Sequence, residues 1–548
     1  MKPSFGSGSR SVASFLWIFA VIISTGVFLR TYHFHDWLAF RGDQVRDAVL
    51  VRDVVSGDAL PPLFGPFMSF SGNGSHSEKR AFHIGPMYYH FQTASAMLFH
   101  THPDALAYPD LLFSILSLPL FYAFMRLRFG KGLSLGLLAL YAVSAYLIHY
   151  SRFAWSCNSI PFFVLLFLYS LTKFLKKDGN TWFWASVLGV AFSIGFQLHA
   201  LTMILFSLTA FLAFLSSMKA DTTAWRRWSV VLLVFLALNA GQIASEFRTG
   251  FQNSKTLLHS VGRDGARNGR SVAVLLKNDL ECHFQANVLY VSSFGSSLER
   301  SNCTHDVYGV FSSRMPVSRG VKVALLSVLA FGALFSVFGY GLLFRSAWTE
   351  RNAENPYFLG IVSLYVVLGF LLMLPLSTGK MNDLRYFSFV FFVPYLFLGL
   401  ISESLSVHVS KKIVSVSVTV TLFILFLCSD LYGVATESAV LARKGATCLG
   451  STTLGEIEPV ADYLISRSLD RKTAYFGTDK SIPLVFGSLE YLLSEKGIRS
   501  VKIHQDGDRI PSGSEGYYVS CSPKRSADYP FRRFDSLYVY RVDGGAQQ

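Results

Sequence analysis

Charged residues are scarce in this sequence of 548 residues, at only 15%, where soluble globular proteins carry roughly a quarter. So few charges could not cover the several soluble domains that this length would otherwise make. Cysteine is equally scarce, at 6 residues, which excludes a disulfide-rich mini-scaffold. Hydrophobic residues make up 51%, with 50 Phe, and the mean hydropathy is +0.39. These figures predict a polytopic α-helical membrane protein and exclude a disordered chain or a coiled coil.

Several common motifs are also missing. The sequence has no Walker-type loop, no dinucleotide-binding fingerprint, no zinc-ligand spacing and no internal repeat. Charged residues are almost absent from the predicted membrane spans, which argues against a proton-coupled transporter or a voltage sensor. Nothing in the sequence indicates a nucleic-acid partner.

Long apolar runs recur along the chain, each close to the roughly 20 residues that cross a bilayer. We predict about eleven membrane spans. Their expected cores are Val12–Leu29, Leu111–Met125, Gly132–Ile148, Ile160–Leu175, Trp182–Leu198, Ala200–Met218, Trp228–Ala244, Val321–Phe344, Tyr357–Leu376, Tyr386–Ile401 and Ile413–Val434.

The net charge of +14 is first of all a topology signal, because Lys and Arg concentrate in cytoplasmic loops. The first apolar run lacks a small-residue cleavage site, so we expect an uncleaved first helix with a cytoplasmic N-terminus. An odd number of spans then places the C-terminus outside. The basic residues that fall on one side under simple alternation are Lys2, Arg10, Arg126, Arg128, Lys131, Lys173, Lys176, Lys177, Lys219, Arg226, Arg227, Arg345, Arg351, Lys411 and Lys412.

This topology predicts a transmembrane domain at 1–434 and a soluble α/β domain at 435–548. Two large outer loops, 30–110 and 245–319, belong to the first of these. In the C-terminal domain we expect helices at Glu456–Ser468 and Ser488–Lys496, and strands at Thr473–Phe476, Ser500–His504, Tyr517–Cys521 and Ser536–Val542. Outer disulfides Cys282–Cys303 and Cys448–Cys521 are compatible with this division, and four free thiols are the alternative.

Polar residues gather at the outer ends of the predicted spans, which indicates a site at the outer membrane interface. Asp43 begins a predicted amphipathic helix and Asp47 follows one turn later on the same face. Asp43 as a helix N-cap is the structural alternative. Other members of the outer set are Gln44, Arg46, His83, Tyr88, Arg152, Trp155, Asn158, Gln197, His199, Glu246, Arg248, Lys380, Asn382, Asp383 and Arg385.

Several of these segments, taken in order, resemble one known family. GDQVRDA, LFGP and HIGPMYYH in the first outer loop resemble bacterial glycosyltransferases of the C-type superfold. This family uses polyprenyl-phosphate sugars and includes relatives of protein O-mannosyltransferases and of the lipid A aminoarabinose transferase. The further pieces, in register over spans one to ten, are YSRFAWSCNSIPFF, GFQLHA, EFRTGFQNS and KMNDLRYFSFVFFVP.

The resemblance implies that Asp43 is the acidic residue of the active site, accepting the proton of the acceptor hydroxyl during inverting transfer. Arg385 and Lys380, with Arg152 as a secondary candidate, would bind the donor phosphate. Many relatives carry Asp-Glu where this chain has Asp43-Gln44, so one carboxylate is missing. Asp47 is the second catalytic candidate, because it would supply this missing charge. A divalent cation is left open as a cofactor, with Asp43 and Asp47 as its only clustered ligands.

The remaining outer residues are expected to contact substrate, with ordinary interfacial roles as their alternatives. Trp155 would stack on a sugar ring, or else anchor the chain at the interface. Gln197 and His199 would contact the sugar or the acceptor. The same role is predicted for Gln44, Arg46, His83, Tyr88, Asn158 and Glu246.

The sequence therefore predicts a membrane glycosyltransferase. It would move a hexosyl or pentosyl group from a polyprenyl-phosphate donor to a lipid, glycan or protein acceptor at the outer face of a bacterial cytoplasmic membrane, in lipopolysaccharide or protein glycosylation. A flippase or transporter of lipid-linked sugars is the alternative, although it would need a hydrophilic path and usually repeat symmetry. A third possibility is a non-catalytic scaffold.

Overall fold

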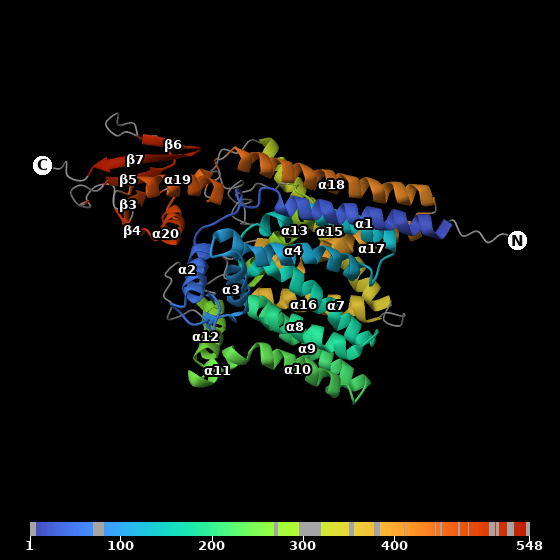
Figure 1. Cartoon of the computed structure of the whole chain (residues 1–548). Coiled ribbons are helices and arrows are strands. Elements are labelled where there is room, and N and C mark those ends of the chain that lie inside the picture. The colour runs from blue at the N-terminus through green and yellow to red at the C-terminus, as the bar shows by residue number, and fades with distance from the viewer. Residues whose placement is uncertain are drawn as a thin grey trace.

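The computed structural model describes most of the chain as helices (Figure 1). The described residues are 7–68, 82–267, 272–294, 319–349, 356–376, 384–409, 411–443, and 445–543 apart from gaps at 446, 450–451, 469–471, 481, 504–509, 511–514 and 523–530.

Each of the eleven predicted spans coincides with helical structure. Among the described residues, eight helices are long and apolar enough to cross a membrane, and one bent pair makes up to nine. Two shorter apolar helices occupy the remaining predicted positions, Lys131–Val143 and Tyr357–Met373. The polytopic α-helical fold is thus confirmed. The helices that match single predicted spans are α1 (Ser7–Thr31), α4 (Pro103–Met125), α7 (Ile160–Lys176), α8 (Thr181–Leu198), α9 (Ala200–Ala220), α15 (Arg319–Thr349), α16 (Pro356–Leu376), α17 (Val393–His408) and α18 (Lys412–Ala442).

Two spans predicted to be continuous are broken. The third divides at Ser144 into α5 (Lys131–Val143) and α6 (Ala145–Tyr150). The seventh divides into α10 (Trp225–Leu238) and α11 (Ala240–Arg248), which are bent by 65°. The first break is stabilised by buried partners: the Ser144 hydroxyl donates to the Tyr290 carbonyl at 2.9 Å, and Asp430 accepts from the Ala145 amide at 3.4 Å. Backbone groups freed inside a bundle require such partners.

The region predicted as the second outer loop contains two helices, α12 (Gln252–Arg267) and α13 (Val272–Val291). Part of α13 packs into the core of the bundle, where Cys282, Ala286 and Tyr290 are buried. Its apolar character is diluted by buried polar groups that pair with other helices. Asn287, for example, donates to Ser336 of α15 at 2.9 Å. Periodicity alone therefore missed this helix.

The first loop is shorter than predicted, because α4 begins at Pro103 instead of Leu111. Pro is well tolerated at the start of a helix, where its missing N–H costs no hydrogen bond. The loop itself carries α2 (Asp43–Ser56), α3 (Met87–Phe99) and a short antiparallel pair, β1 (Phe67–Met68) with β2 (Phe82–His83).

The C-terminal domain is a five-stranded sheet with two helices, as its alternation of apolar and turn residues predicts. The strand order is β4-β3-β5-β7-β6, parallel between β4, β3 and β5 and antiparallel from β5 to β6. The short edge strand β6 was not predicted. The elements of the C-terminal domain are α19 (Leu454–Arg467), α20 (Val485–Glu495), β3 (Thr473–Thr478), β4 (Arg499–Lys502), β5 (Glu515–Ser520), β6 (Phe531–Phe534) and β7 (Leu537–Asp543).

This domain and the first loop share one hydrophobic core. Phe40 and Val51 of the loop pack in the same buried cluster as Leu489 of α20. The Phe40 amide donates to the Thr452 carbonyl at 3.0 Å, and Ser488 donates to the Phe40 carbonyl at 2.6 Å. Figure 1 shows both at one end of the helical bundle, with the N-terminus at the other. Loop and domain therefore lie on the same side of the bundle.

Candidate functional site

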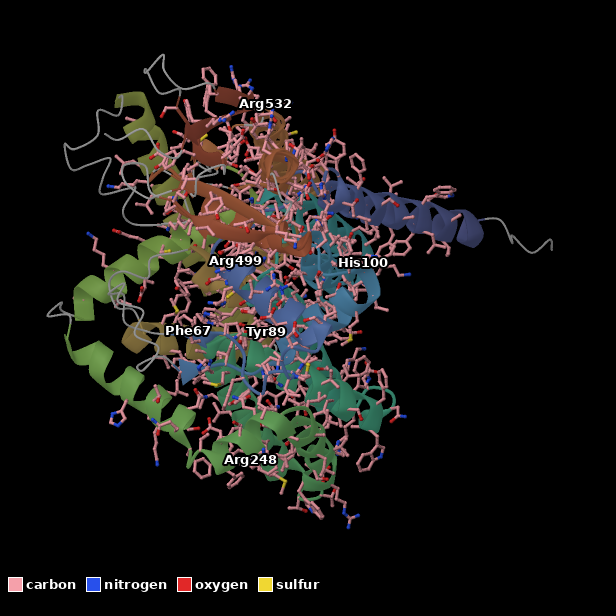
Figure 2. The ribbon with its side chains drawn as sticks, turned by 60° about the vertical axis from the view of Figure 1, so that its left-hand side comes forward. Phe67, Tyr89, His100, Arg248, Arg499 and Arg532 are labelled. Atoms are coloured by element: carbon pink, nitrogen blue, oxygen red, sulfur yellow. A yellow bond between two sulfur atoms is a disulfide. The ribbon has the colours of Figure 1, made fainter. Side chains whose placement is uncertain are left out.

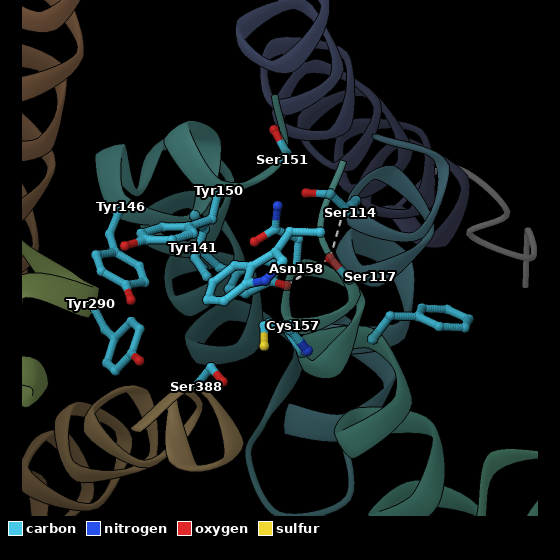
Figure 3. A pocket seen from close by; sticks show the side chains of 14 residues that line it. Ser114, Ser117, Tyr141, Tyr146, Tyr150, Ser151, Cys157, Asn158, Tyr290 and Ser388 are labelled. Carbon is cyan, nitrogen blue, oxygen red and sulfur yellow. Dashed lines mark hydrogen bonds between the residues drawn. The ribbon is translucent and has the colours of Figure 1, made fainter. Parts of the chain in front are cut away.

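An aromatic pocket of about 500 Å³ opens between the segment after α6 and the segment before α17 (Figure 3). Its polar lining includes Asn158, whose buried Oδ1 atom has no hydrogen-bond partner among the described residues. This oxygen is therefore an acceptor that the described part of the protein leaves unused. Tyrosine, serine and tryptophan side chains predominate in the wall, which consists of Ser114, Ser117, Tyr141, Tyr146, Leu147, Tyr150, Ser151, Trp155, Cys157, Asn158, Pro161, Phe162, Tyr290 and Ser388.

A second hollow of about 260 Å³ shares Trp155, Cys157 and Ser388 with the first. His199 and Tyr386 line it as well, with their ring centroids 6.1 Å apart. Ser388 and Tyr386 belong to η4 (Leu384–Val390), a short 3-10 helix that precedes α17. The structure thus brings together two predicted site residues, Trp155 and His199, from segments distant in the sequence.

Behind the pocket lies Asp110, a fully buried carboxylate that the sequence did not single out. It accepts hydrogen bonds from the Trp155 amide at 3.0 Å, from Ser159 at 2.6 Å and from the Tyr88 hydroxyl at 2.6 Å. Three donors offset much of the cost of burying a carboxylate. Asp110 therefore fixes the backbone that carries Trp155 and Asn158.

Adjacent tyrosines of α3 connect two carboxylates. Tyr88 donates to Asp110, whereas the Tyr89 hydroxyl donates to Asp47 of α2 at 2.9 Å. Tyr88 was predicted to contact substrate, and the structure instead buries it completely against Asp110. The paired tyrosines, an aromatic belt in a purely interfacial interpretation, are hydrogen-bonded parts of the site.

The charged residues at the start of α2 form one network around Arg46. The guanidinium donates to Asp43 at 2.9 Å and to Asp47 at 2.8 Å. Arg46 also lies 5.4 Å from the ring centroid of Phe67, which Figure 2 labels together with Tyr89. Asp43 is the first residue of α2 and Gly42 is the N-cap, so the N-cap alternative for Asp43 is wrong.

The two carboxylates of this network differ in exposure. The Asp43 side chain is 57% exposed and that of Asp47 is 2% exposed. Burial raises the pKa of Asp47 to about 6, although Arg46 and Tyr89 oppose the shift. Asp43 is therefore the accessible carboxylate and Asp47 the one that holds Arg46 in place. Since the Arg46 guanidinium pairs with both acids, these residues do not fit a divalent cation.

Gln197 and two Gly-Pro motifs, Gly65-Pro66 and Gly85-Pro86, support the start of α3. The Gly65 amide donates to the Ile84 carbonyl at 2.8 Å, so the two motifs lie side by side. Gln197 accepts from the Met87 amide at 3.2 Å and donates to the Leu238 carbonyl at 3.2 Å. Gln197 was predicted to contact substrate, but it is fully buried and bonded to backbone on both sides. Its position favours a structural role.

Other predicted residues also have mainly structural contacts. Arg152 is buried and donates to the Leu29 and Tyr32 carbonyls at the end of α1, at 2.6 and 2.8 Å. Gln44 is buried in α2. Glu246 is buried near the end of α11, and the backbone of His83 exchanges hydrogen bonds with the Asn253 side chain. Because the Arg152 guanidinium already donates to backbone carbonyls, the prediction that Arg152 binds the donor phosphate is weakened.

Lys380, Asn382 and Asp383 lie outside the described residues. Arg385 lies in η4, the helix that supplies Ser388 and Tyr386 to the pocket walls. Its predicted role at the donor phosphate therefore stays a prediction, made for a residue on a segment that borders the pocket.

Charge within the spans is less rare than the sequence indicated. Besides Asp110, the bundle buries Asp430 of α18 and Arg30 at the end of α1. Arg30 donates to Ser114 at 2.8 Å and to the Ala142 carbonyl at 2.8 Å. A buried charge near a span end is itself a signal that sequence reasoning could have used.

Comparison with known proteins supports the family resemblance. Residues 83–241 match the family model described as dolichyl-phosphate-mannose-protein mannosyltransferase. No curated protein sequence matched the chain.

Two solved structures match the chain at low sequence identity. ArnT from Cupriavidus metallidurans bound to undecaprenyl phosphate is 12% identical with a TM-score of 0.48, over 99% of this chain and 100% of that one. The apo oligosaccharyltransferase from Archaeoglobus fulgidus is 12% identical with a TM-score of 0.49, over 89% of this chain. The chain covers 64% of the length of that enzyme. The resemblance to the protein O-mannosyltransferase family that the sequence motifs indicated is thus confirmed over residues 83–241, which include most of the pocket.

Proposed function

We propose that the chain transfers a sugar from a polyprenyl-phosphate donor to a hydroxyl acceptor, on the side of the membrane that carries the first loop and the C-terminal domain. The observation that carries this proposal is the Asp43–Arg46–Asp47 network, in which one carboxylate is accessible and the other is buried. The family match over residues 83–241 supports a lipid-linked mannosyl or related donor.

In the proposed reaction the acceptor oxygen attacks the anomeric carbon from the face opposite the phosphate. The new C–O bond forms as the bond to the phosphate oxygen breaks, and the lipid phosphate leaves with that electron pair. Asp43 takes the acceptor proton. The transfer inverts the anomeric centre because the nucleophile and the leaving group occupy opposite faces.

The hydrogen bonds around Arg46 support this assignment. Arg46 orients Asp43, and Asp47 with Tyr89 fixes Arg46. Arg385 would stabilise the charge that develops on the leaving phosphate, since arginine offers two parallel donors to phosphate. Trp155 and Asn158 would form a sugar subsite, with the ring as a platform and the Asn158 Oδ1 atom as an acceptor.

The proposed setting is a bacterial cytoplasmic membrane with the N-terminus in the cytoplasm and the C-terminus outside. The first loop and the C-terminal domain share a hydrophobic core, which supports placing both on the same side of the membrane. The basic loops of the sequence support assigning the opposite side to the cytoplasm.

The test replaces Asp43 with Asn in purified protein reconstituted with a labelled polyprenyl-phosphate sugar. Loss of transfer with donor binding retained is expected. Asp53→Asn is the matched control, because Asp53 lies on the same helix, is half-buried and pairs with its neighbour Arg52 at 3.0 Å. Movement of the labelled lipid across the bilayer without transfer would instead identify a flippase.

A further inference from the structure

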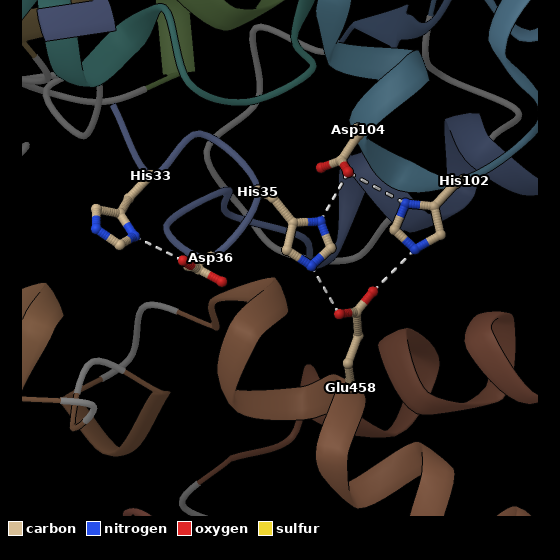
Figure 4. A network of polar contacts seen from close by, with 6 residues as sticks. All are labelled: His33, His35, Asp36, His102, Asp104 and Glu458. Carbon is tan, nitrogen blue, oxygen red and sulfur yellow. Dashed lines mark hydrogen bonds and ion pairs between the residues drawn. The ribbon is translucent and has the colours of Figure 1, made fainter. Parts of the chain in front are cut away.

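Outside this site, two histidines and two carboxylates form a closed ring between the first loop and the C-terminal domain (Figure 4). His35 follows α1, His102 and Asp104 begin α4, and Glu458 belongs to α19. The Nδ1 atoms of His35 and His102 lie 2.7 and 3.5 Å from Asp104 Oδ2. Their Nε2 atoms lie 2.9 and 2.8 Å from the two oxygens of Glu458.

The two sides of each imidazole ring thus face different carboxylates. The ligand atoms of His35, His102 and Asp104 all lie within 4.8 Å of one another. Glu458 accepts from both rings on the opposite side, which is where metal-binding histidines usually donate to a carboxylate. The second oxygen of Asp104, Oδ1, is buried and has no hydrogen-bond partner among the described residues. This oxygen is a further ligand that the protein itself does not use.

Without a cation, the ring requires both imidazoles to be doubly protonated, because each ring nitrogen faces a carboxylate oxygen. A divalent cation on the Nδ1 side would replace the two Nδ1 protons. Its charge equals the total charge of the two protons that it displaces. The Nε2 protons remain on the rings and continue to donate to Glu458.

We propose that His35, His102 and Asp104 bind one Zn²⁺ ion, with Glu458 holding both imidazoles from behind. Two imidazole nitrogens with one carboxylate oxygen are a common zinc ligand set, with ligand bonds of about 2.0–2.2 Å. Half-exposed His35 leaves the site open to solvent, with a side chain 46% exposed. His35 and His102 lie near the two ends of the first loop, Asp104 lies in the first turn of α4, and Glu458 comes from α19. The ion would therefore fasten the C-terminal domain to this end of the bundle.

The test uses the full-length protein in detergent, stripped with a chelator and then titrated with Zn²⁺ alone. One ion per chain is expected by calorimetry and elemental analysis. His102→Ala should abolish this binding, and Glu458→Gln should weaken it about 10- to 100-fold. His33→Ala is the matched control, because His33 lies in the same segment and pairs with Asp36, at 2.7 Å, instead of with the ring.

Two outcomes would overturn the proposal. One is wild-type protein that binds no Zn²⁺ at micromolar concentrations. The other is binding that survives His102→Ala but is lost in Asp43→Asn, which would place the ion at the α2 carboxylates. Retention of the Cys448–Cys521 disulfide and a monodisperse elution profile establish that the variants are folded, and Glu458→Gln keeps the test decisive if His102→Ala is not.

Discussion

At the scale of single residues, Asp47 shows why a buried carboxylate can matter without touching substrate. Desolvation raises its pKa to about 6, while Arg46 and Tyr89 favour its charged form. Ionised Asp47 holds the guanidinium that in turn orients Asp43. Protonation of Asp47 weakens its ion pair with Arg46.

We therefore predict that transfer falls as the pH decreases through about 6, with the slope of a single proton. The folding stability that depends on Asp47 changes with pH in the opposite direction. A carboxyl pKa raised on folding contributes stability that is present below its unfolded value of 3.8 and is lost as pH rises through 6. A pH–rate profile of wild type, Asp47→Asn and Asp53→Asn tests this. An acid limb unchanged in Asp47→Asn would rule out Asp47 as its source.

The sequence indicated Asp43, Asp47 and Trp155 because acidic and aromatic residues at a membrane interface are unusual enough to notice. It did not indicate Asp110, which lies one residue before a predicted span and is recognisable only through its three donors. Gln197 illustrates the converse. A polar residue at a span end looked like a substrate contact, yet its amide is bonded to backbone on both sides.

At the scale of elements, the close packing of α3 on α8 depends on Gly85. A Cβ atom at this position would meet Gln197 Cγ at 2.2 Å and Gln197 Oε1 at 2.5 Å. Gly85→Ala must therefore displace Gln197 or the start of α3, which carries Tyr88 and Tyr89. Overpacking of this kind typically costs about 1–3 kcal/mol.

We predict that Gly85→Ala lowers thermal stability and transfer together. Gly132→Ala is the control, because a Cβ atom added to Gly132 in α5 meets nothing within 4 Å. That change should leave stability equal or raise it by up to about 1 kcal/mol, since Ala favours helix over Gly. Thermal unfolding in detergent compares the two. Equal melting temperatures for both variants would contradict the packing argument.

Helix positions were predictable because length and apolarity alone define a membrane span. Helix breaks were not. The division at Ser144 depends on Asp430, which accepts from the freed Ala145 amide, and on the Tyr290 carbonyl, which accepts from the Ser144 hydroxyl. Near the other break, the Asn239 side chain donates to Ser193 at 2.6 Å. Helix α13 was missed for a related reason, since its buried polar residues find partners on other helices.

At the scale of the whole molecule, the C-terminal domain is fastened to the first loop by a shared core and by the ring of His35, His102, Asp104 and Glu458. The domain itself is closed by the Cys448–Cys521 disulfide, one of the two pairings that the sequence allowed. The other involves Cys303, which lies outside the described residues. Disulfide pairing depends on geometry that cysteine spacing does not supply.

We predict that the double change Cys448→Ser and Cys521→Ser destabilises the C-terminal domain by about 4 kcal/mol, from the entropy of opening a loop of its size. The two residues are separated by 73 positions. Hydrogen exchange in β3 and β5 should accelerate, while exchange in the membrane helices stays the same. Cys428→Ser, which removes an exposed free thiol, is the control. Unchanged exchange in β3 would refute the prediction.

Asp43 is proposed to accept a proton during transfer of a lipid-linked sugar. The most direct measurement is the transfer rate of Asp43→Asn in reconstituted membranes, with donor binding measured on the same samples. We expect a loss of transfer of at least 100-fold, as for removal of a general base, with donor binding retained and Asp53→Asn active. Wild-type transfer rates in Asp43→Asn would contradict it.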